Sequence, residues 1–242
     1  IGKRIEVMNK TISIILCTYN EVNYIEEAIN LITKTLKNTE IIIVDDNSID
    51  GTLNKLDKLK SNFHFKLIIR KKERGFASAV YRGLNEATGD YVGFIDVNSY
   101  DQIIHFKDMI SKLDNRYDIS VLSRYVPGGG DERVFLRSFS SKAINSVCKF
   151  LLRIPFNDFT SGIFLMRKNL LNYVRVIPTG HGEFFIEFIY SVYKKNFKII
   201  EIPYVQKKDN NLGKSKSNPN IFHFFYLGFM YFLRIILTIF RN

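Results

Sequence analysis

The chain lacks the residues and signals that are typical of secreted, disulfide-bonded proteins. Its 242 residues include no tryptophan and two cysteines, Cys17 and Cys148, both of which fall inside apolar segments. We expect both to be buried free thiols in a reducing compartment. Residues 1–10 contain no apolar core of a secretory signal, and we expect them to be an N-terminal extension or a remnant of expression.

Acidic residues are also in short supply. The sequence has 35 Lys and Arg residues against 24 Asp and Glu residues, which gives a formal net charge of +11. Such an excess indicates an anionic partner, which can be nucleic acid, an anionic membrane surface or a phosphorylated substrate. The lysines are scattered, with no basic helix and no strand of the kind that binds RNA, so the sequence argues against a nucleic-acid partner.

No linker rich in Pro, Gly or Ser interrupts the first half of the chain, where apolar strands alternate with segments of helical spacing. This alternation predicts a parallel, right-handed α/β sheet within one domain. Ser48 or Asp50 is expected to cap the second helix, and Gly89 to close the third. Strands are expected at 11–17, 40–46, 65–70 and 90–96, and helices at 21–36, after the turn 47–52, and at 75–89.

The second half continues with the same kinds of element. A Gly-rich loop is expected at 124–133, and a polar, basic loop at 205–220 is expected to stay mobile until a ligand binds. Helices are expected at 101–113, 135–153 and 182–195, and strands at 117–123, 163–167 and 197–204.

The C-terminal segment 221–240 is apolar all round and is interrupted only by His223 and Arg234. About 20 such residues can span a hydrocarbon core of ~30 Å. Arg234 lies deep in the segment, however, and a central arginine costs ~2.5–3.5 kcal/mol on insertion. Three interpretations stay open, namely a core helix, a helix in the membrane interface and a spanning helix, and we favour the second.

Polar residues follow three of the expected strands, in "CTYNE", "VDDNSIDGT" and "FIDVN". Ligands of parallel sheets bind outside the carboxyl ends of the strands. A single aspartate at a strand end is more typical of a turn or a cap, but three such ends on one rim predict a ligand site. The residues brought to this rim are Tyr19, Glu21, Asp45, Asp46, Asp96 and Asn98.

With "TYNE", "VDDNSIDGT" and "ERGFASAVYRGLNEATGDYVGFID", the chain resembles a family 2 glycosyltransferase with the GT-A fold. More closely, residues 12–217 resemble the polyprenyl-phosphate sugar transferases of the dolichol-phosphate mannose synthase type. The resemblance implies a Rossmann-like, mostly parallel central sheet flanked by helices over residues 11–217. From the apolar composition of the C-terminal segment, we expect residues 218–242 to form an apolar, membrane-associated helix.

The resemblance assigns the rim to a nucleoside-diphosphate sugar. The implied donor-binding residues are Thr18, Tyr19, Glu21, Asp45, Asp46, Gly75, Asp96 and Val97. Asp96-Val97-Asn98 stands where the family has Asp-x-Asp, which holds Mg²⁺ or Mn²⁺ against the diphosphate. Asn98 brings no charge, so it weakens the metal site, and Asp101 can compensate in part. The alternative is that Asn98 marks a degenerate, inactive site.

The resemblance also implies an acceptor half. Arg124, Arg137 and Ser141 match residues that bind the acceptor phosphate, and Asp96, Arg124 and Arg137 are the implied catalytic residues. A lipid phosphate is already anionic, so it needs positioning and charge screening rather than a strong base, and arginine suits that task. The motif 158–162 would lie near the acceptor and the sugar, and Glu187, on a looser match, near the sugar. A flexible loop would close over the diphosphate with Lys208, Gly213, Lys214, Ser215 and Lys216.

We therefore hypothesise a metal-dependent, inverting hexosyltransferase at the cytoplasmic face of a membrane. It would move mannose or glucose from a donor of the GDP-mannose or UDP-glucose type to a polyprenyl or dolichyl phosphate. One alternative is a family 2 glycosyltransferase that acts on a soluble or polymeric glycan, and another is a catalytically weakened homologue recruited to the membrane. A nucleotidyltransferase is disfavoured, because the first strand is followed by "TYNE" and not by a Gly-rich loop with Lys or Arg.

Overall fold

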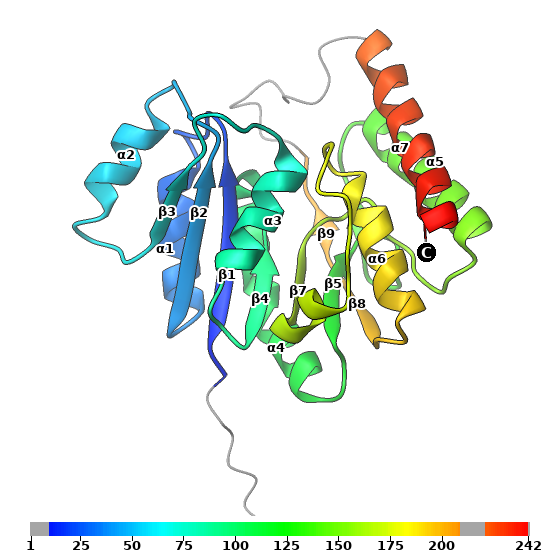
Figure 1. Ribbon diagram of the computed structural model, residues 1–242, viewed down its shortest axis with the longest axis horizontal. Coiled ribbons are helices and arrows are strands. Elements are labelled where there is room, and N and C mark those ends of the chain that lie inside the picture. The colour runs from blue at the N-terminus through cyan, green and yellow to red at the C-terminus, as the bar shows by residue number, and fades with distance from the viewer. Residues whose placement is uncertain (1–9, 209–220, 242) are drawn as a thin grey trace, which may run out of the picture.

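A mixed sheet of seven strands forms the centre of the molecule (Figure 1). The structure is a computed structural model that describes residues 10–208 and 221–241. The strand order is β3-β2-β1-β4-β7-β5-β8, and a second, two-stranded sheet pairs β6 with β9. The strands are β1 (Ile12–Thr18), β2 (Thr39–Asp45), β3 (Lys66–Ile69), β4 (Tyr91–Phe94), β5 (Ile119–Ser123), β6 (Gly130–Asp131), β7 (Phe164–Arg167), β8 (Ile199–Pro203) and β9 (Val205–Gln206).

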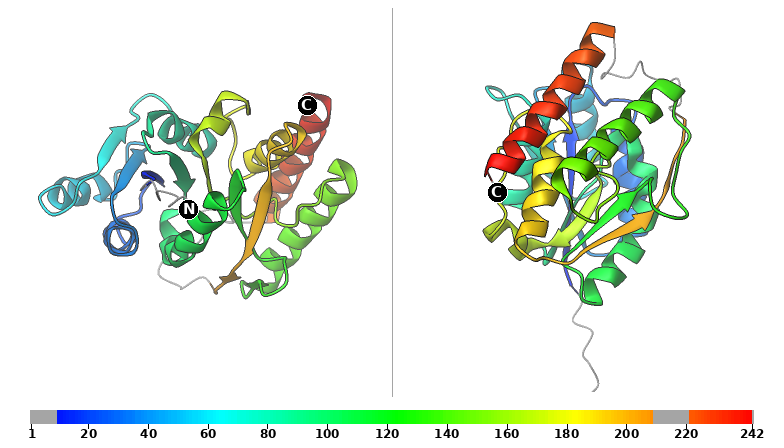
Figure 2. Two further views of the ribbon diagram at one scale, coloured as in Figure 1. Left: turned by 90° about the horizontal axis from the view of Figure 1, so that it is seen from below. Right: turned by 90° about the vertical axis from the view of Figure 1, so that its right-hand side faces the viewer.

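Helices cover both faces of the sheet (Figures 1 and 2). One face packs against α1 (Ile25–Thr35), α2 (Thr52–Leu59), the 3₁₀ helix η1 (Val97–His105) and α4 (Phe106–Asp114). The other face packs against α3 (Phe76–Glu86), α5 (Phe135–Leu152) and α6 (Phe184–Lys194). The 3₁₀ helix η2 (Lys168–Asn172) follows β7, and α7 (Ile221–Arg241) lies against α5 and α6.

The apolar runs of the sequence become strands that are buried on both faces. In β1, Ile14 and Leu16 enter the core beside α1, whereas Ile15 enters the core beside α3, and none of the three is exposed. Because successive side chains of a strand point to opposite faces, a strand covered on both sides has to be apolar throughout. The prediction of an α/β fold with a mostly parallel sheet is confirmed.

β7 is the one strand of the central sheet that runs antiparallel to its neighbours, β4 and β5. The backbone N–H of Arg124, just after β5, donates to Asp158 Oδ2 at 2.9 Å. The segment that leads into β7 therefore starts at the edge where β5 ends, and β7 has to run back across the sheet. The direction of this strand depends on a long-range contact that no local pattern shows.

Gly89 does not close α3, contrary to the prediction. The helix ends at Glu86, and Gly89 lies just before β4. A Cβ atom at Gly89 would lie 2.8 Å from the backbone nitrogen of Ser13, so the close approach to β1 leaves no room for a side chain. Glycine is required at this position by packing and not by a helix terminus.

Both cysteines are free, as predicted. Cys148 is buried, and burial raises the pKa of its thiol to about 12. Cys17 is only partly buried, which differs from the prediction. The reducing compartment stays a prediction.

The C-terminal helix α7 lies within the predicted range and packs on the domain through charged residues. Arg234 is 5% exposed, and its Nη1 atom lies 2.8 Å from Oε2 of Glu187, which is 1% exposed. Arg241 pairs with the same carboxylate. None of the helices in the described part of the chain combines the length and apolarity needed to cross a membrane. The arginine that interrupts the apolar segment is thus an internal contact of the fold.

We predict that Arg234→Met lowers the free energy of unfolding by about 3–5 kcal/mol, because it leaves the Glu187 carboxylate buried with only the partly exposed Arg241. Urea unfolding followed by circular dichroism measures the change. The double substitution Glu187→Met with Arg234→Met should recover most of the loss, since it removes both buried charges. Unchanged stability of the single variant would show that α7 is not held by this pair.

Candidate active site

The carboxyl ends of β1, β2 and β4 meet at one edge of the sheet, as the sequence predicts. Thr18 lies opposite Asp45 in the parallel pairing of β1 with β2, and Asp96 follows β4, which pairs with β1 on its other side. We call this region the donor edge and define it as residues 18–21, 45, 46, 75 and 96–98. Because these segments come from neighbouring strand ends, the polar residues singled out in the sequence are brought together.

Asp45 is the internal support of the donor edge. It has no exposed surface, and it accepts hydrogen bonds from Thr18 Oγ1 at 2.6 Å and from the Ser48 N–H and Oγ at 2.8 and 2.7 Å. Ser48 therefore does not cap α2, as had been one of two alternatives. The N-cap is Gly51 in the left-handed region, while Asp50 accepts the Thr52 N–H at 3.0 Å. Direct contact of Asp45 with a nucleotide stays a prediction.

Asp46 and Arg70 hold the loop before α3. Arg70 Nε donates to Asp46 Oδ1 at 2.6 Å, and the Gly75 N–H donates to Asp46 Oδ2 at 2.9 Å. Arg70 Nη2 also donates to the Gly75 carbonyl at 2.8 Å, and Arg70 is 6% exposed. Arg70 is not among the residues predicted from the sequence, although its place directly after the third strand puts it at the same edge as those residues.

Tyr19 and Arg74 form a flat, cationic surface on the donor edge. The guanidinium carbon of Arg74 lies 3.8 Å from the centroid of the Tyr19 ring, a close cation–π contact. Arg74 is exposed and was not predicted. Glu21 is partly buried, and its N–H donates to Thr52 Oγ1 at 2.9 Å. An aromatic face beside an arginine suits a planar base and an anionic phosphate.

The predicted metal ligands lie at the junction between β4 and η1. Asp96 is partly buried, Val97 is buried, and Asn98 is exposed with its Oδ1 accepting Ser99 Oγ at 3.1 Å. In the described part of the chain, no group of three or more His, Cys, Asp or Glu side chains is arranged to hold a metal. Burial, and then the charge of Asp96, raise the pKa of Cys17, so its thiol stays protonated.

This donor set fits a hard divalent cation that takes most of its ligands elsewhere. Asp96 and Asn98 offer one carboxylate and one amide oxygen, and Mg²⁺ and Mn²⁺ accept both kinds. Asp101, which could compensate for Asn98, is exposed and accepts Gln102 Nε2 at 3.0 Å. A cation at this place would need the oxygens of phosphate groups and of water to complete its coordination.

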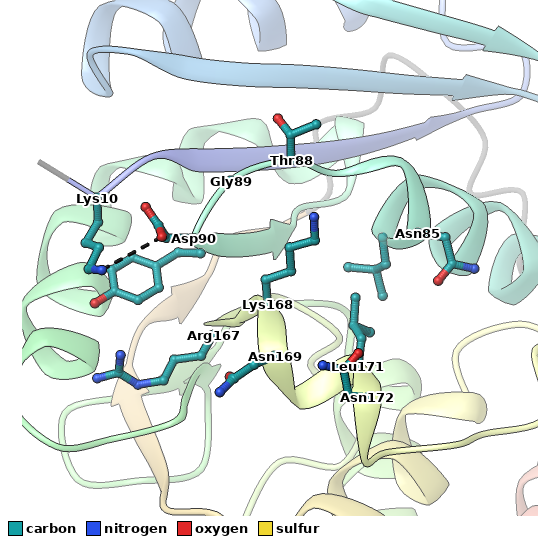
Figure 3. Close-up of a pocket in the computed structure, with 12 residues that line it drawn as sticks. Lys10, Asn85, Thr88, Gly89, Asp90, Arg167, Lys168, Asn169, Leu171 and Asn172 are labelled. Atoms are coloured by element: carbon teal, nitrogen blue, oxygen red, sulfur yellow. Dashed lines mark ion pairs between the residues drawn. The ribbon is translucent and has the colours of Figure 1, made fainter.

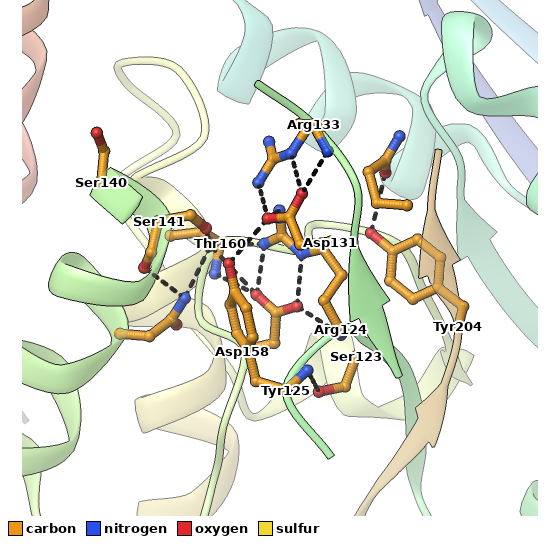
Figure 4. Close-up of polar contacts among 12 residues, drawn as sticks. Ser123, Arg124, Tyr125, Asp131, Arg133, Ser140, Ser141, Asp158, Thr160 and Tyr204 are labelled. Carbon is orange, nitrogen blue, oxygen red and sulfur yellow. Dashed lines mark hydrogen bonds and ion pairs between the residues drawn. The ribbon is translucent and has the colours of Figure 1, made fainter. Parts of the chain in front are cut away.

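A cluster of two arginines and two aspartates lies at the end of β5 (Figure 4). Arg124 is 4% exposed, and it donates to Asp158 from Nε at 2.8 Å and from Nη2 at 2.6 Å. Nη2 also donates to Thr160 Oγ1 at 2.7 Å, and Nη1 lies 3.7 Å from Asp131 Oδ2. Burial alone would lower the pKa of Arg124, but the charge and the hydrogen bonds of Asp158 raise it above its ordinary value. Contact of Arg124 with an acceptor phosphate stays a prediction, and Nη1 is the group left for it.

Arg133 completes the cluster. Its Nε and Nη2 atoms donate to the two oxygens of Asp131 at 2.8 and 2.7 Å, and Tyr125 Oη lies 3.0 Å from Asp131 Oδ2. Burial alone would raise the pKa of Asp131, but the hydrogen bonds and charge of Arg133 lower it to about 2. Asp131 therefore stays charged at neutral pH beside the two arginines. Arg133 was not singled out in the sequence, where it lies in the Gly-rich loop.

The first turns of α5 join the cluster to the motif 158–162. Ser141 Oγ lies 2.6 Å from Thr160 Oγ1, and Asn145 Nδ2 donates to the same hydroxyl at 3.0 Å. Arg137 is partly buried and precedes Ser141 by four residues, so both side chains lie on the same side of the helix. The structure thus brings the predicted acceptor residues into one region.

Two further groups of predicted residues have a different outcome. The carboxylate of Glu187 forms ion pairs with Arg234 and Arg241 of α7, which does not support a place for Glu187 beside the sugar. Lys208 is exposed at the end of the first described range. Gly213, Lys214, Ser215 and Lys216 lie outside the described residues.

A cavity of about 620 Å³ lies away from the donor edge (Figure 3). It is lined by Gly89 and Asp90, which precede β4, and by Arg167 and Lys168, which end β7 and begin η2. Because β4 and β7 are antiparallel, these residues all lie at the amino end of β4. The cavity is therefore separate from the predicted site.

The chain is similar to a family model and to proteins of known name. The family model described as glycosyl transferase family 2 matches residues 13–175. The dolichol-phosphate mannosyltransferase of Pyrococcus furiosus is 36% identical over 198 residues, which cover 80% of this chain and 55% of that protein. The dolichol-phosphate mannosyltransferase of Saccharomyces cerevisiae is 32% identical over 142 residues, which cover 56% of this chain and 51% of that protein. The chain spans about half the length of these curated relatives.

Solved structures support the same fold. Glucosyl-3-phosphoglycerate synthase from Mycobacterium tuberculosis, in complex with Mn²⁺, UDP and phosphoglyceric acid, has a TM-score of 0.72 at 15% identity, covering 95% of this chain and 78% of that chain. Its complex with Mg²⁺ and UDP has a TM-score of 0.70 at 15% identity, covering 95% and 79%. At this identity the likeness concerns the fold alone, and it confirms the predicted GT-A architecture. With two thirds of its length matched by the family model, the chain belongs to glycosyltransferase family 2.

Proposed function

We propose that the protein transfers a hexose from a nucleoside-diphosphate sugar to a polyprenyl phosphate at a membrane surface. The main support for this proposal is that α5 combines candidate phosphate-binding residues with exposed apolar side chains. This helix bears the predicted phosphate residues Arg137 and Ser141, and it also exposes large apolar side chains: Phe135, Leu136, Phe139, Val147 and Phe150. Such a helix suits an acceptor in which a phosphate group is attached to a long apolar chain.

The neighbouring helix α7 also exposes large apolar side chains. It exposes Tyr226, Phe229, Phe232, Leu233, Leu237, Ile239 and Phe240 and lies against α5. Large apolar side chains exposed on two neighbouring helices indicate a contact surface, and the net charge of +11 favours an anionic one. A membrane surface, with the catalytic domain at its cytoplasmic face, meets both requirements.

The donor edge would bind the nucleoside diphosphate. Tyr19 and Arg74 offer the ring and the charge for a base and a phosphate, while Asp46 and Arg70 hold the Gly75 loop beside them. Asp96 and Asn98 would hold Mg²⁺ or Mn²⁺. When bound, that cation neutralises charge on the departing diphosphate. The solved relatives named above were determined with Mn²⁺ or Mg²⁺ and UDP, which supports such a donor site.

The acceptor oxygen of a lipid phosphate is already anionic, so the protein has to position it rather than remove a proton. It attacks the anomeric carbon of the sugar. A new carbon–oxygen bond forms as the bond to the diphosphate breaks, and the configuration inverts. Arg137 and Ser141 would contact the phosphate. Arg124 keeps Asp158 and Thr160 in place behind them and offers only Nη1 to the acceptor.

The proposed function is tested with radiolabelled GDP-mannose or UDP-glucose, Mn²⁺ and vesicles that contain polyprenyl phosphate. We expect label in the organic extract, and none when the vesicles lack polyprenyl phosphate or when the protein carries Asp96→Ala. Absence of label with either donor, or label confined to water-soluble glycans, would refute the polyprenyl acceptor.

Arg137→Ala should lower kcat/KM for the lipid phosphate by about 10–100-fold, the value of one hydrogen bond to a charged group at about 1.5–3 kcal/mol. Donor affinity, measured by calorimetry without acceptor, should stay unchanged. Arg82→Ala, an exposed arginine of α3, is the matched control and should change neither quantity. An equal loss of donor binding and transfer in Arg137→Ala would contradict the acceptor role.

Asn98→Asp should tighten Mn²⁺ binding in the presence of nucleoside diphosphate, because a charged ligand replaces a neutral one. Turnover should be equal or higher if the natural site is weakened but working. Asn85→Asp, on the exposed end of α3, controls for the added charge. If the enzyme is inactive both with Asn98 and with Asp in its place, the site is degenerate.

A further inference from the structure

The segment of residues 177–183 connects the C-terminal helix to the donor edge. It leads into α6, and its two ends contact one element while its middle contacts another. Contacts at residues 177, 179 and 182 involve α7, and contacts at residues 180 and 181 involve the start of α3. No sequence motif indicates that α7 and the start of α3 are connected in this way.

On the α7 side, one guanidinium group supports the segment. Arg234 Nη1 donates to the Ile177 carbonyl at 3.2 Å, and Nη2 donates to the Thr179 carbonyl at 2.7 Å. The same group is paired with Glu187 of α6. Arg234 thus fixes two successive parts of the chain relative to α7, and its planar fork fits this arrangement of acceptors.

The path of the segment leaves little freedom. Gly180 has a φ of +84°, and a Cβ atom there would lie 1.8 Å from Glu183 Oε1. A Cβ atom at Gly182 would lie 2.8 Å from Oη of Tyr231, three residues before Arg234 on α7. The His181 N–H donates to Glu183 Oε2 at 2.9 Å, which closes the turn. The backbone is therefore held close to α7 with His181 at its tip.

Toward the donor edge, Gly180 and His181 contact the first turn of α3. The Gly180 carbonyl accepts the Ala77 N–H at 3.3 Å. The His181 ring stacks on Phe76, with centroids 4.8 Å apart and planes 14° apart. Phe76 in turn meets Phe94 edge to face at 5.5 Å. Phe94 ends β4, two residues before the predicted metal ligand Asp96.

We propose that His181 and Arg234 are positioning residues for donor binding. Arg234 sets the place of the segment, and His181 fixes Phe76. The adjacent Gly75 gives its N–H to Asp46 at the donor edge. The inference rests on the proposed function only in assigning the donor edge to a nucleoside-diphosphate sugar. Under this proposal the C-terminal helix α7 affects donor binding indirectly, through residues 177–183 and α3. None of the residues that define the donor edge belongs to α7.

The test is the dissociation constant of the donor, measured by calorimetry with GDP-mannose or UDP-glucose and Mg²⁺, without acceptor. His181→Ala and Arg234→Lys should each weaken binding about tenfold, equivalent to about 1.4 kcal/mol. The lysine keeps a positive charge beside Glu187, but its single nitrogen cannot reproduce the planar fork that reaches Glu187 and both carbonyl groups. His181→Phe keeps a flat ring on Phe76 and should bind the donor as the natural protein does. The KM for lipid phosphate should stay unchanged in all three variants.

The matched control is His64→Ala, which removes an exposed histidine before β3, at the edge opposite the donor edge. It should leave donor affinity unchanged. Donor binding at the natural level in both His181→Ala and Arg234→Lys would overturn the inference. So would an Arg234→Lys variant that loses thermal stability yet binds the donor normally while folded, since its role would then be structural alone. Because the readout needs no acceptor, donor binding without transfer to lipid would refute the proposed acceptor and leave this inference standing.

Discussion

A buried carboxylate paired with a buried arginine is the interaction that organises this protein at the carboxyl edge of its sheet. In the described part of the chain such pairs include Asp46 with Arg70, Asp158 with Arg124, and Glu187 with Arg234. Each pair joins segments that are distant in sequence. Removal of one partner would leave a buried charge without its main compensating partner, so each pair permits little rearrangement. The polar loops are thereby held in place before any ligand binds, which is what electrostatic catalysis requires.

A consequence is that several motif residues act through their neighbours. The oxygens of Asp46 are engaged by Arg70 and Gly75, and two of the three nitrogens of the Arg124 side chain are engaged by Asp158 and Thr160. The side chains left at the surface for a ligand are others, such as Arg74 at the donor edge. In this account the buried pairs set the geometry, and partly exposed residues beside them make the contacts.

The sequence allowed the α/β class, most strands and the shared rim to be predicted, because these depend on local patterns. An uninterrupted apolar run such as that of β1 indicates a strand covered on both faces, and a parallel sheet brings its polar ends to one edge. The direction of β7, the close approach at Gly89 and the partner of Arg234 could not be predicted. Each depends on contacts between residues far apart in the chain, for which a single sequence carries no periodic signal.

The most direct test of the account is a crystal structure with nucleoside diphosphate, Mg²⁺ and a short-chain polyprenyl phosphate. We predict that the acceptor phosphate contacts Arg137 and Ser141, with the diphosphate between Arg74 and Asp96. We also predict that the bidentate pair of Arg124 with Asp158 is unchanged. A phosphate bound elsewhere on the protein, or an Arg124 that has left Asp158 to bind it, would contradict the account.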